Sequence, residues 1–421
     1  MEYVGIVGGL RTYIGVEGGM YRNVSAEQLG AHVLRQIPAR CGIPVEDIDM
    51  VIAGNGIGGG GNVTRLALLE AGYPQEISGI TVDVQCGSGL EAIAMAAAKI
   101  EAGLADVIVA GGMESASTKP TRVHNERHPD YCAEHPAYSV AKFAPGTQDE
   151  LAMLKGAERV GRKLGIDKNA LEQYVITSHQ RATEAAEQGL LDDVLAMPYY
   201  ESGEVDSRNA KAYDEGIRPK MSERLLRRLP ALVPGGEYVT AGTVSLTNDG
   251  AAFVVLCSAK YASTHELSWE AQLVDVVSVG ADPDYSPESM VPAIHKLLER
   301  NAVPAEQITA WEYNEAFAVI DEIVAREFGE QRDRYNIYGG ALAYGHPYGA
   351  SGAIITLHLL QALRQLDVPE VISGMDGSER KYGIAAVSAA GGIGTAMLLE
   401  WNEEPDKRKK GEKKGDGMQD E

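Results

Sequence analysis

The sequence predicts an α/β protein, because strand-like runs rich in Val, Ile and Ala alternate with helical segments along most of its length. With 421 residues, the chain exceeds what one small core needs, which favours two or three folded units. The expected strands are residues 3–8, 50–54, 107–110, 273–279, 310–313 and 383–389.

Two stretches share one layout, which suggests an internal duplication. Residues 83–112 and residues 336–392 each run through a Gly-rich turn and an Ala-rich helix to a strand that ends in Gly-Gly. A duplicated α/β half explains this pattern. A chance recurrence of two Gly-rich turns is the alternative.

Between these halves the pattern changes to longer helical stretches at 149–164 and 168–189, which we interpret as an inserted cap. We therefore expect an N-terminal half at 1–118, a cap at 119–242, a C-terminal half at 243–401 and a tail at 402–421. The tail contains six basic and seven acidic residues with almost no apolar ones, so we expect it to be disordered.

The composition, 44% hydrophobic and 23% charged, is ordinary for a globular protein. No apolar run reaches the ~18–20 residues of a membrane-spanning helix, and the first residues lack the pattern of a secretory signal. We therefore expect a cytoplasmic protein without a membrane partner. The net charge of −22 opposes nucleic-acid binding, because phosphates would be repelled by most of the surface.

The four cysteines, Cys41, Cys86, Cys132 and Cys257, lie far apart and without metal-ligand spacing. They suggest neither a metal site nor a disulfide framework. Free thiols in a reducing compartment are the simplest interpretation.

Cys86 lies where a strand-like run ends, a Gly-containing turn follows and an Ala-rich helix begins at Ser88. The free N–H groups and the dipole of a helix N-terminus favour a thiolate, so we expect the thiol pKa to fall below about 8.5. Cys86 is therefore a candidate nucleophile. The alternative is a small buried residue that packs against the sheet.

Three further segments offer polar side chains or free backbone donors. His346 lies among the glycines of 339–352, which let a ligand approach, and is a candidate base toward a thiol. Asn314 follows the predicted strand 310–313, at a strand end where α/β proteins bind ligands. Gly391 and Gly392 follow the last predicted strand and offer N–H donors for an oxyanion. An ordinary helix start and a tight turn are the alternatives for the last two segments.

These segments, in this order, resemble the thiolase family from Arg11 to Met397. The run Q-C-G-S-G-L around Cys86 matches the family's acylated nucleophile, and N-E-A-F matches its water-holding residue at Asn314. The run G-H-P-Y-G-A-S-G matches its catalytic histidine at His346. The resemblance implies two βαβαβαββ halves, packed as a five-layered α/β sandwich, with a loop domain between them.

The resemblance also implies a channel for coenzyme A. The positions matching this channel include Arg218 and the segment 240–250 with Ser245, while Met153 falls in the matching acyl and pantetheine pocket. The phosphates of the cofactor would suit a local basic cluster, with a solvated helix face as the alternative. This cluster consists of Arg218, Lys220, Arg224, Arg227 and Arg228.

The sequence departs from the family near its C-terminus. Ser388 stands where thiolases carry a second cysteine, which acts as a base for the α-carbon or the incoming thiol. A serine hydroxyl is rarely ionised near neutral pH, whereas a thiol can be brought into range. Acylation is therefore expected, and the second half-reaction is open.

The sequence thus predicts an acyltransferase of the acetyl-CoA C-acetyltransferase or 3-ketoacyl-CoA thiolase type, active in lipid and fatty acid metabolism. The alternatives are an acyl-CoA hydrolase and a non-catalytic acyl-CoA-binding scaffold. We expect coenzyme A as substrate or product, with no metal and no permanently bound cofactor. A homodimer is expected, with a homotetramer as the alternative.

Overall fold

A computed structural model of the protein describes residues 3–146, 148–199, 213–329, 332–367 and 380–402. Its framework is a β-sheet that has ten strands within these residues and contains all six predicted ones. The short strand β2 (Gly15–Val16) pairs with β8. Across the sheet, the other strands follow in the order β10 (Ile308–Tyr313), β11 (Tyr382–Ala389), β12 (Ile393–Trp401), β9 (Ala271–Gly280), β1 (Val4–Arg11), β8 (Asn248–Ser258), β5 (Val107–Ser115), β3 (Met50–Gly54) and β4 (Ser78–Val82).

The sheet consists of two halves with the same strand directions. In the N-terminal half, β1, β8 and β5 pair antiparallel, and β5, β3 and β4 pair parallel. In the C-terminal half, β9, β12 and β11 pair antiparallel, and β11 and β10 pair parallel. A parallel bridge between Trp311 and Tyr335 takes the place of β4. The predicted duplication is therefore present in the strand topology.

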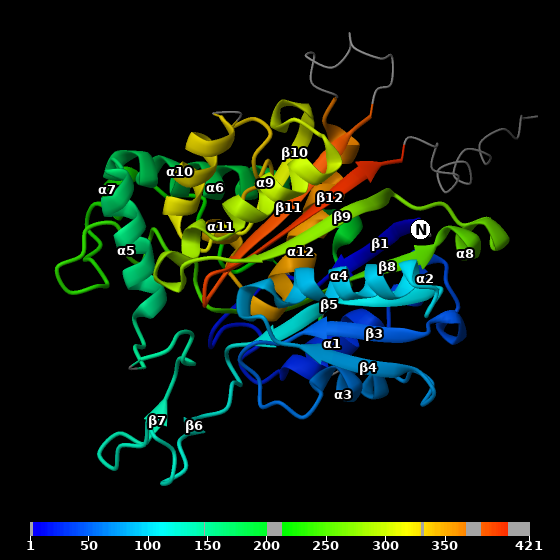
Figure 1. The fold of residues 1–421 in the computed structure, drawn as a ribbon, viewed down its shortest axis with the longest axis horizontal. Helices are drawn as coiled ribbons and strands as arrows, with labels where there is room; N and C mark the ends of the chain where they lie inside the picture. Colours follow the sequence, from blue (N-terminus) through cyan, green and yellow to red (C-terminus); the bar gives the residue numbers. More distant parts are fainter. Residues whose placement is uncertain (1–2, 147, 200–212, 330–331, 368–379, 403–421) are drawn as a thin grey trace, which may run out of the picture.

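Helices form three layers around these two halves (Figure 1). The middle layer contains α4 (Ser88–Glu101) and α12 (Tyr348–Gln365), which pack against each other and against both halves of the sheet. On the outer faces, α1 (Ala26–Leu34) and α3 (Val63–Glu70) cover the N-terminal half, and α9 (Met290–Asn301) covers the C-terminal half. This is the five-layered sandwich that the sequence implies.

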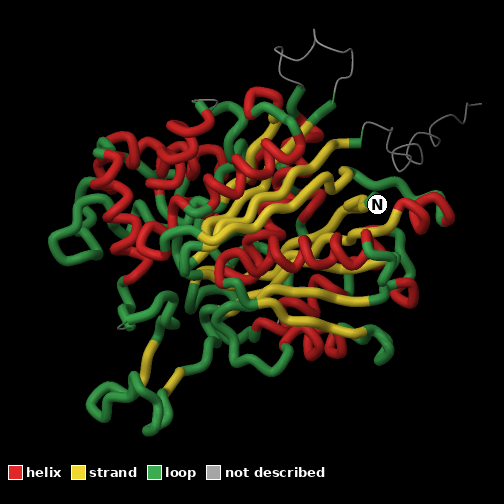
Figure 2. Tube along the Cα trace, viewed as in Figure 1, coloured by secondary structure: helices red, strands yellow, loops and turns green. Residues whose placement is uncertain are grey.

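The remaining helices are α2 (Ile37–Cys41), α5 (Ala152–Leu164), α6 (Lys168–Gln188), α7 (Glu223–Leu226), α8 (Ala259–Thr264), α10 (Ala318–Phe328) and α11 (Ala341–Tyr344). A small arm formed by β6 (Arg122–Val123) and β7 (Ala137–Tyr138) projects from the body (Figure 2). Within the part of the chain that is described, no helix has both the length and the apolar character needed to cross a membrane.

The predicted boundary between cap and C-terminal half differs from the strand pairing. That boundary, at 242/243, assigned β8 to the C-terminal half, but β8 lies between β1 and β5 in the N-terminal half. The N-terminal half is therefore completed by a strand that follows the cap, because the hydrogen bonds of β8 join it to β1 and β5. The tail predicted from 402 lies, apart from Asn402, outside the described residues.

Glycines let the first turn of α12 sit directly on its neighbours. A Cβ atom added to Gly89 of α4 would lie 2.7 Å from the carbonyl oxygen of Gly349 in α12. Added to Gly54 at the end of β3, it would lie 2.5 Å from the same oxygen, and added to Gly112 within β5 it would lie 1.8 Å from it. The strands β3 and β5 and the helix α4 of the N-terminal half thus contact the first turn of α12 so closely that a methyl group would not fit between them.

We predict that Gly112→Ala lowers the free energy of unfolding by about 3 kcal/mol or more, because its methyl group overlaps the backbone of Gly349. The control is Gly280→Ala at the end of β9, where an added Cβ meets nothing within 4 Å. That variant should stay within about 0.5 kcal/mol of the parent. Urea unfolding measures both, and equal stabilities would contradict the tight contact.

Candidate active site

Cys86 lies in the 3-10 turn Gln85–Gly87 between β4 and α4. Gln85 has a φ of 51°, a left-handed conformation that is uncommon for a residue with a side chain. The hydroxyl of Ser88 holds this turn, since it accepts from the N–H of Val84 at 2.8 Å and donates to the carbonyl of Gln85 at 2.6 Å. The turn places Cys86 at the N-terminus of α4, against α12 and β11.

The thiol of Cys86 is buried, and burial raises its pKa to about 12. The backbone N–H groups of Ala390 and of Cys86 itself favour the thiolate, whereas the charges of Glu114 and Asp83 oppose it. The expected fall in the thiol pKa is therefore wrong for this state, because lost hydration outweighs the helix N-terminus. The thiol keeps its proton until a base removes it.

His346 occupies the matching place in the other half, two residues before α12 begins. Its Nδ1 lies 2.6 Å from the hydroxyl of Ser351, which donates its own proton to the carbonyl of Pro347. Nδ1 must then carry the imidazole proton and donate it to Ser351. Nε2 is left as the unprotonated, basic nitrogen of His346.

Burial lowers the pKa of His346 to about 3, so its imidazole is neutral near neutral pH. Since burial raises the pKa of the Cys86 thiol to about 12, both groups are uncharged at rest, one as a thiol and the other as a neutral imidazole. Proton transfer between such groups becomes favourable only when the thiolate is consumed as it forms. This arrangement suits a nucleophile that is activated during attack on a bound carbonyl.

Asn314 follows β10, and its side-chain Nδ2 lies 3.2 Å from Nε2 of His346. The next residue, Glu315, is held elsewhere, because its buried carboxylate accepts from Ser178 at 2.7 Å and from Asn336 at 2.8 Å. These bonds fasten the segment after β10 to α6 and to the chain before α11. The structure therefore brings Asn314 and His346 together and keeps Glu315 away from them.

Ser388 lies in β11, and its hydroxyl is bonded to the start of α9. Its oxygen accepts a hydrogen bond from the N–H of Met290 at 3.0 Å, and its O–H donates to the carbonyl of Pro287 at 3.0 Å. Both bonds join it to backbone groups, a geometry that favours a structural role for this side chain. A catalytic role for Ser388 stays a prediction.

Besides the N–H of Cys86 itself, the backbone group that favours the thiolate is the N–H of Ala390, which precedes the predicted pair of glycines. The N–H of Gly392 donates instead to the hydroxyl of Ser286 at 3.1 Å. Gly391 lines a hollow of about 170 Å³ that also contacts Met153. The N–H that favours the thiolate thus belongs to Ala390, and an oxyanion role for Gly391 and Gly392 stays a prediction.

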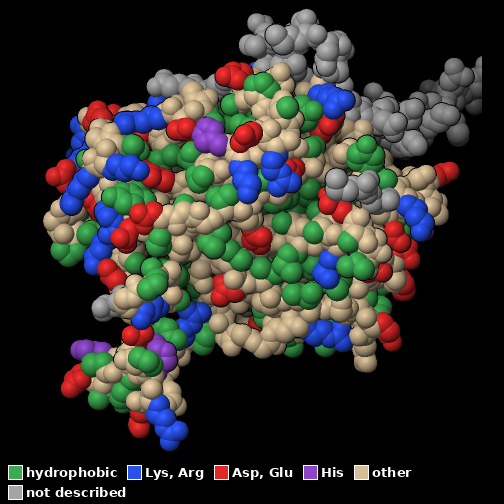
Figure 3. Space-filling view, viewed as in Figure 1, with side chains coloured by type: hydrophobic (Ala, Val, Ile, Leu, Met, Phe, Trp, Pro, Cys, Tyr) green, Lys and Arg blue, Asp and Glu red, His purple; other side chains and the backbone are tan. Residues whose placement is uncertain are grey.

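The predicted coenzyme A residues lie around the cap. The N–H of Ser245 donates to the carbonyl of Ala316 at 3.0 Å, so the segment with Ser245 runs beside N-E-A-F. Arg218 is exposed, and its guanidinium donates to the carbonyls of Glu215 and Ile217. Figure 3 shows Lys and Arg interspersed with acidic side chains over α5–α7.

A hollow of about 350 Å³ extends along this surface. It contacts Lys168 and Arg227 as well as Thr240 and Thr243 of the predicted channel. Arg227 is already paired with carboxylates, at 3.3 Å from Glu172 and 2.8 Å from its helix neighbour Glu223. At least one member of the predicted basic cluster, Arg227, is therefore already bonded to side chains of this chain.

Sequence reasoning missed two contributors beside the histidine. Ser351 fixes the protonation of the imidazole, and Tyr348 stacks edge-on against His346 with ring centroids 4.7 Å apart. Both belong to the run G-H-P-Y-G-A-S-G. Their place in the first turn of the helix that follows the histidine was the available signal.

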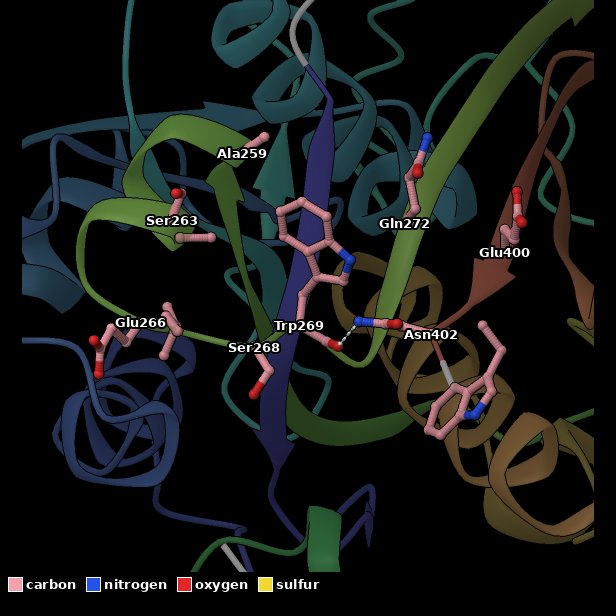
Figure 4. Close-up of a pocket in the computed structure, with 11 residues that line it drawn as sticks. Ala259, Ser263, Glu266, Ser268, Trp269, Gln272, Glu400 and Asn402 are labelled. Atoms are coloured by element: carbon pink, nitrogen blue, oxygen red, sulfur yellow. Dashed lines mark hydrogen bonds between the residues drawn. The ribbon is translucent and has the colours of Figure 1, made fainter. Parts of the chain in front are cut away.

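Another hollow, of about 500 Å³, lies elsewhere (Figure 4). It is bounded by Trp269 before β9 and by Asn402 after β12, which hydrogen-bond to each other at 3.2 Å. Its place at the far end of β12 puts it about 25 Å from the turn beside Cys86. Among the described residues, no group of three or more His, Cys, Asp or Glu side chains could hold a metal ion.

Comparisons with known proteins identify the family. The family model described as "Thiolase, N-terminal domain" matches residues 4–260, and "Thiolase, C-terminal domain" matches residues 267–401. A relative from Staphylococcus aureus, named "Putative acetyl-CoA C-acetyltransferase VraB", is 33% identical over 401 residues, which are 95% of this chain and 99% of the relative.

Solved structures agree with this match. The Bacillus anthracis acetyl-CoA acetyltransferase superposes with a TM-score of 0.85 at 31% identity and covers 96% of this chain and 99% of its own. Human mitochondrial 3-ketoacyl-CoA thiolase in complex with CoA gives a TM-score of 0.82 at 27% identity and covers 95% of this chain and 98% of its own. The chain therefore belongs to the thiolase family and is an acyltransferase.

Proposed function

We propose that the protein takes an acyl group from a coenzyme A thioester onto Cys86 and passes it to a second acceptor. The observation that carries this proposal is the meeting of two helix N-termini at one buried site. One brings the thiol of Cys86, and the other brings the basic Nε2 of His346 with Asn314 beside it. Nucleophile, base and hydrogen-bonding amide are the parts that acyl transfer through a covalent intermediate needs.

In the first step, Nε2 of His346 takes the proton of Cys86 while the sulfur forms a bond to the thioester carbon. The negative charge that develops on the carbonyl oxygen suits the backbone N–H groups of Cys86 and Ala390. The bond between that carbon and the coenzyme A sulfur then breaks. His346 returns its proton to the leaving sulfur, and an acyl-enzyme remains.

In the second step the acyl group moves to an acceptor of the acetyl-CoA acetyltransferase or 3-ketoacyl-CoA thiolase reaction. That acceptor is the thiol of another coenzyme A or the α-carbon of acetyl-CoA, and either must lose a proton. The human relative in complex with CoA supports coenzyme A as the carrier. The hollow that contacts Arg227 and Thr243 supports its approach along the cap. We assign Arg218 and Ser245 to this approach because they match the family's channel positions.

Hydrolysis of acyl-CoA is the second candidate function. The observation in its favour is Ser388, whose hydroxyl is bonded to the backbone at Met290 and Pro287 where thiolases carry a thiol base. Without a base for a carbon or thiol acceptor, water remains as the acceptor that could release the acyl group.

We also propose a homodimer formed through β4. This strand is the edge of the sheet within the described residues, and its five residues are only partly buried or exposed. Nearby α3 exposes the apolar side chains of Leu66 and Leu69. An unpaired edge next to exposed apolar side chains favours pairing with a second copy.

We predict that acetyl-CoA adds one acetyl group to the wild-type chain and none to Cys86→Ala, because the alanine variant has no nucleophile. Intact-protein mass spectrometry measures the mass gain, and peptide mapping locates it. Cys132→Ala removes an exposed thiol and serves as the control that keeps the label. Label on Cys86→Ala, or a label that maps to Cys132, would contradict the assignment.

We predict that Arg218→Ala weakens acyl-CoA binding about tenfold, because the exposed guanidinium lies in the basic cluster proposed to meet the cofactor phosphates. Alkylation of Cys86 by iodoacetamide should keep its parent rate. Arg300→Ala, an exposed arginine on α9, is the control and should bind normally. Titration calorimetry decides, and unchanged affinity would move the phosphate site elsewhere.

We predict that Ser388→Cys speeds acetoacetyl-CoA thiolysis by up to about 10²-fold without changing the rate of Cys86 acylation, because a thiol can act as the missing base. Ser388→Ala should thiolyse at the parent rate, although it leaves the N–H of Met290 without this acceptor. Stopped-flow assays measure both steps. A folded Ser388→Ala variant that loses thiolysis would make the serine itself the working group.

A further inference from the structure

The two halves can be compared residue by residue when one strand pair in each half is taken as equivalent. Val109 of β5 pairs with Val51 of β3, as Gly383 of β11 pairs with Ala310 of β10. Glu114 lies five residues after Val109, and Ser388 lies five residues after Gly383. Glu114 therefore corresponds to Ser388.

The next strand gives the same correspondence. Glu114 pairs with Gly250 of β8, and Ser388 pairs with Gly394 of β12. Asn55 lies four residues after Val51 of β3, and Asn314 lies four residues after Ala310 of β10, so these two asparagines also correspond. Each half therefore carries an asparagine and a second polar side chain at equivalent places near the site.

In the N-terminal half, the second polar side chain is a carboxylate without solvent exposure, and it accepts four hydrogen bonds. Oε1 of Glu114 accepts from Nδ2 of Asn55 at 2.7 Å and from the N–H of Ile57 at 3.3 Å. Oε2 accepts from the N–H of Gly56 at 2.8 Å and from that of Gly349 at 3.0 Å. One oxygen thus joins the loop after β3 to the first turn of α12.

We propose that Glu114 is a positioning residue that fixes His346 relative to Cys86, an inference that rests on the proposed function. On one side, Glu114 holds Gly349, which follows His346 in the same loop and helix turn. On the other side it holds the loop at Gly56, which lies against the nucleophile turn, since a Cβ added there would be 3.5 Å from Cα of Gln85. Glu114 therefore ties the two catalytic loops to one carboxylate.

The glycine contact beneath α12 cannot fix this geometry by itself. Gly54, Gly112 and Gly349 allow close approach, but they have no side chains to lock the helix in place. A hydrogen bond to a backbone N–H in the first turn of a helix has a defined direction, and a negative charge there is stabilised by the helix dipole. The carboxylate supplies the restraint that the glycines lack.

The charge of Glu114 does not serve to activate the thiol. It raises the pKa of Cys86, and its own pKa is raised by burial to about 7. Burying this group has an energetic cost and disfavours the thiolate. Holding the two loops in place is the role that its four hydrogen bonds support.

The test begins with Glu114→Gln, which keeps the size of the side chain but leaves an amide nitrogen that cannot accept a hydrogen bond. We expect the rate of Cys86 acylation and kcat to fall about 10–100-fold, with KM for the acyl-CoA within about threefold. The control is Asp49→Asn, a carboxylate that accepts from the N–H groups of Asp106 and Val107 at the opposite end of the same strands. It should keep the parent kcat.

A double-mutant cycle separates positioning from general loss of structure. If Glu114 acts through the histidine, Glu114→Gln should slow acylation by less than about threefold in the His346→Ala background. A tenfold or greater loss in that background would overturn the proposal, as would a parent rate for Glu114→Gln alone. Thermal unfolding of every variant confirms that folded proteins are compared.

The same data distinguish this inference from the proposed function. If Cys86→Ala still takes up the acyl group, or if His346→Ala acylates at the parent rate, the proposed function fails. If both variants behave as expected and Glu114→Gln acylates at the parent rate, only the role of Glu114 is lost.

Discussion

The site depends on one contact, in which the first turn of α12 meets α4, β3 and β5 through glycine backbones. The carbonyl oxygen of Gly349 lies where Cβ atoms on Gly54, Gly89 or Gly112 would collide with it. This contact joins the two halves of the fold where their middle helices begin. Because Cys86 and His346 each lie two residues before such a helix, the distance between the proposed nucleophile and the proposed base depends on backbone packing.

The same packing excludes water, and the chemistry of the site follows from that. Burial raises the pKa of Cys86 to about 12 and lowers the pKa of His346 to about 3, so the resting site holds two neutral groups. A neutral thiol is protected from adventitious reactions, and the imidazole stays available as a base. The network through Ser351 and Asn314 keeps Nε2 free of a proton.

The two halves share strand order but have specialised at equivalent positions. Where the C-terminal half has Ser388, bonded to the start of α9, the N-terminal half has Glu114, bonded across to α12. Asn55 binds this carboxylate, whereas its counterpart Asn314 lies beside Nε2 of His346. In the proposed mechanism, one half therefore contributes the nucleophile and the positioning carboxylate, and the other contributes the base and its amide partner.

Much of the fold could be predicted from the sequence. Alternating apolar runs indicated the six strands, and the repeated Gly-rich turns indicated the two halves, because these signals are local. β8 and β12 were not predicted, and the assignment of β8 depends on long-range pairing. Its hydrogen bonds to β1 and β5 place it in the N-terminal half, although the whole cap separates it from these strands in the sequence.

For the site, the sequence by itself determined the chemical groups, since the motifs around Cys86, Asn314 and His346 name a nucleophile, an amide and a base. Only the tertiary structure decided whether these groups carry a proton at rest. A helix N-terminus predicts a lower thiol pKa, but burial by distant segments reverses the sign. The tertiary structure also decided which groups lie at the site, because Ala390 and Glu114 reach it through strand pairing and helix packing, neither of which a local pattern records.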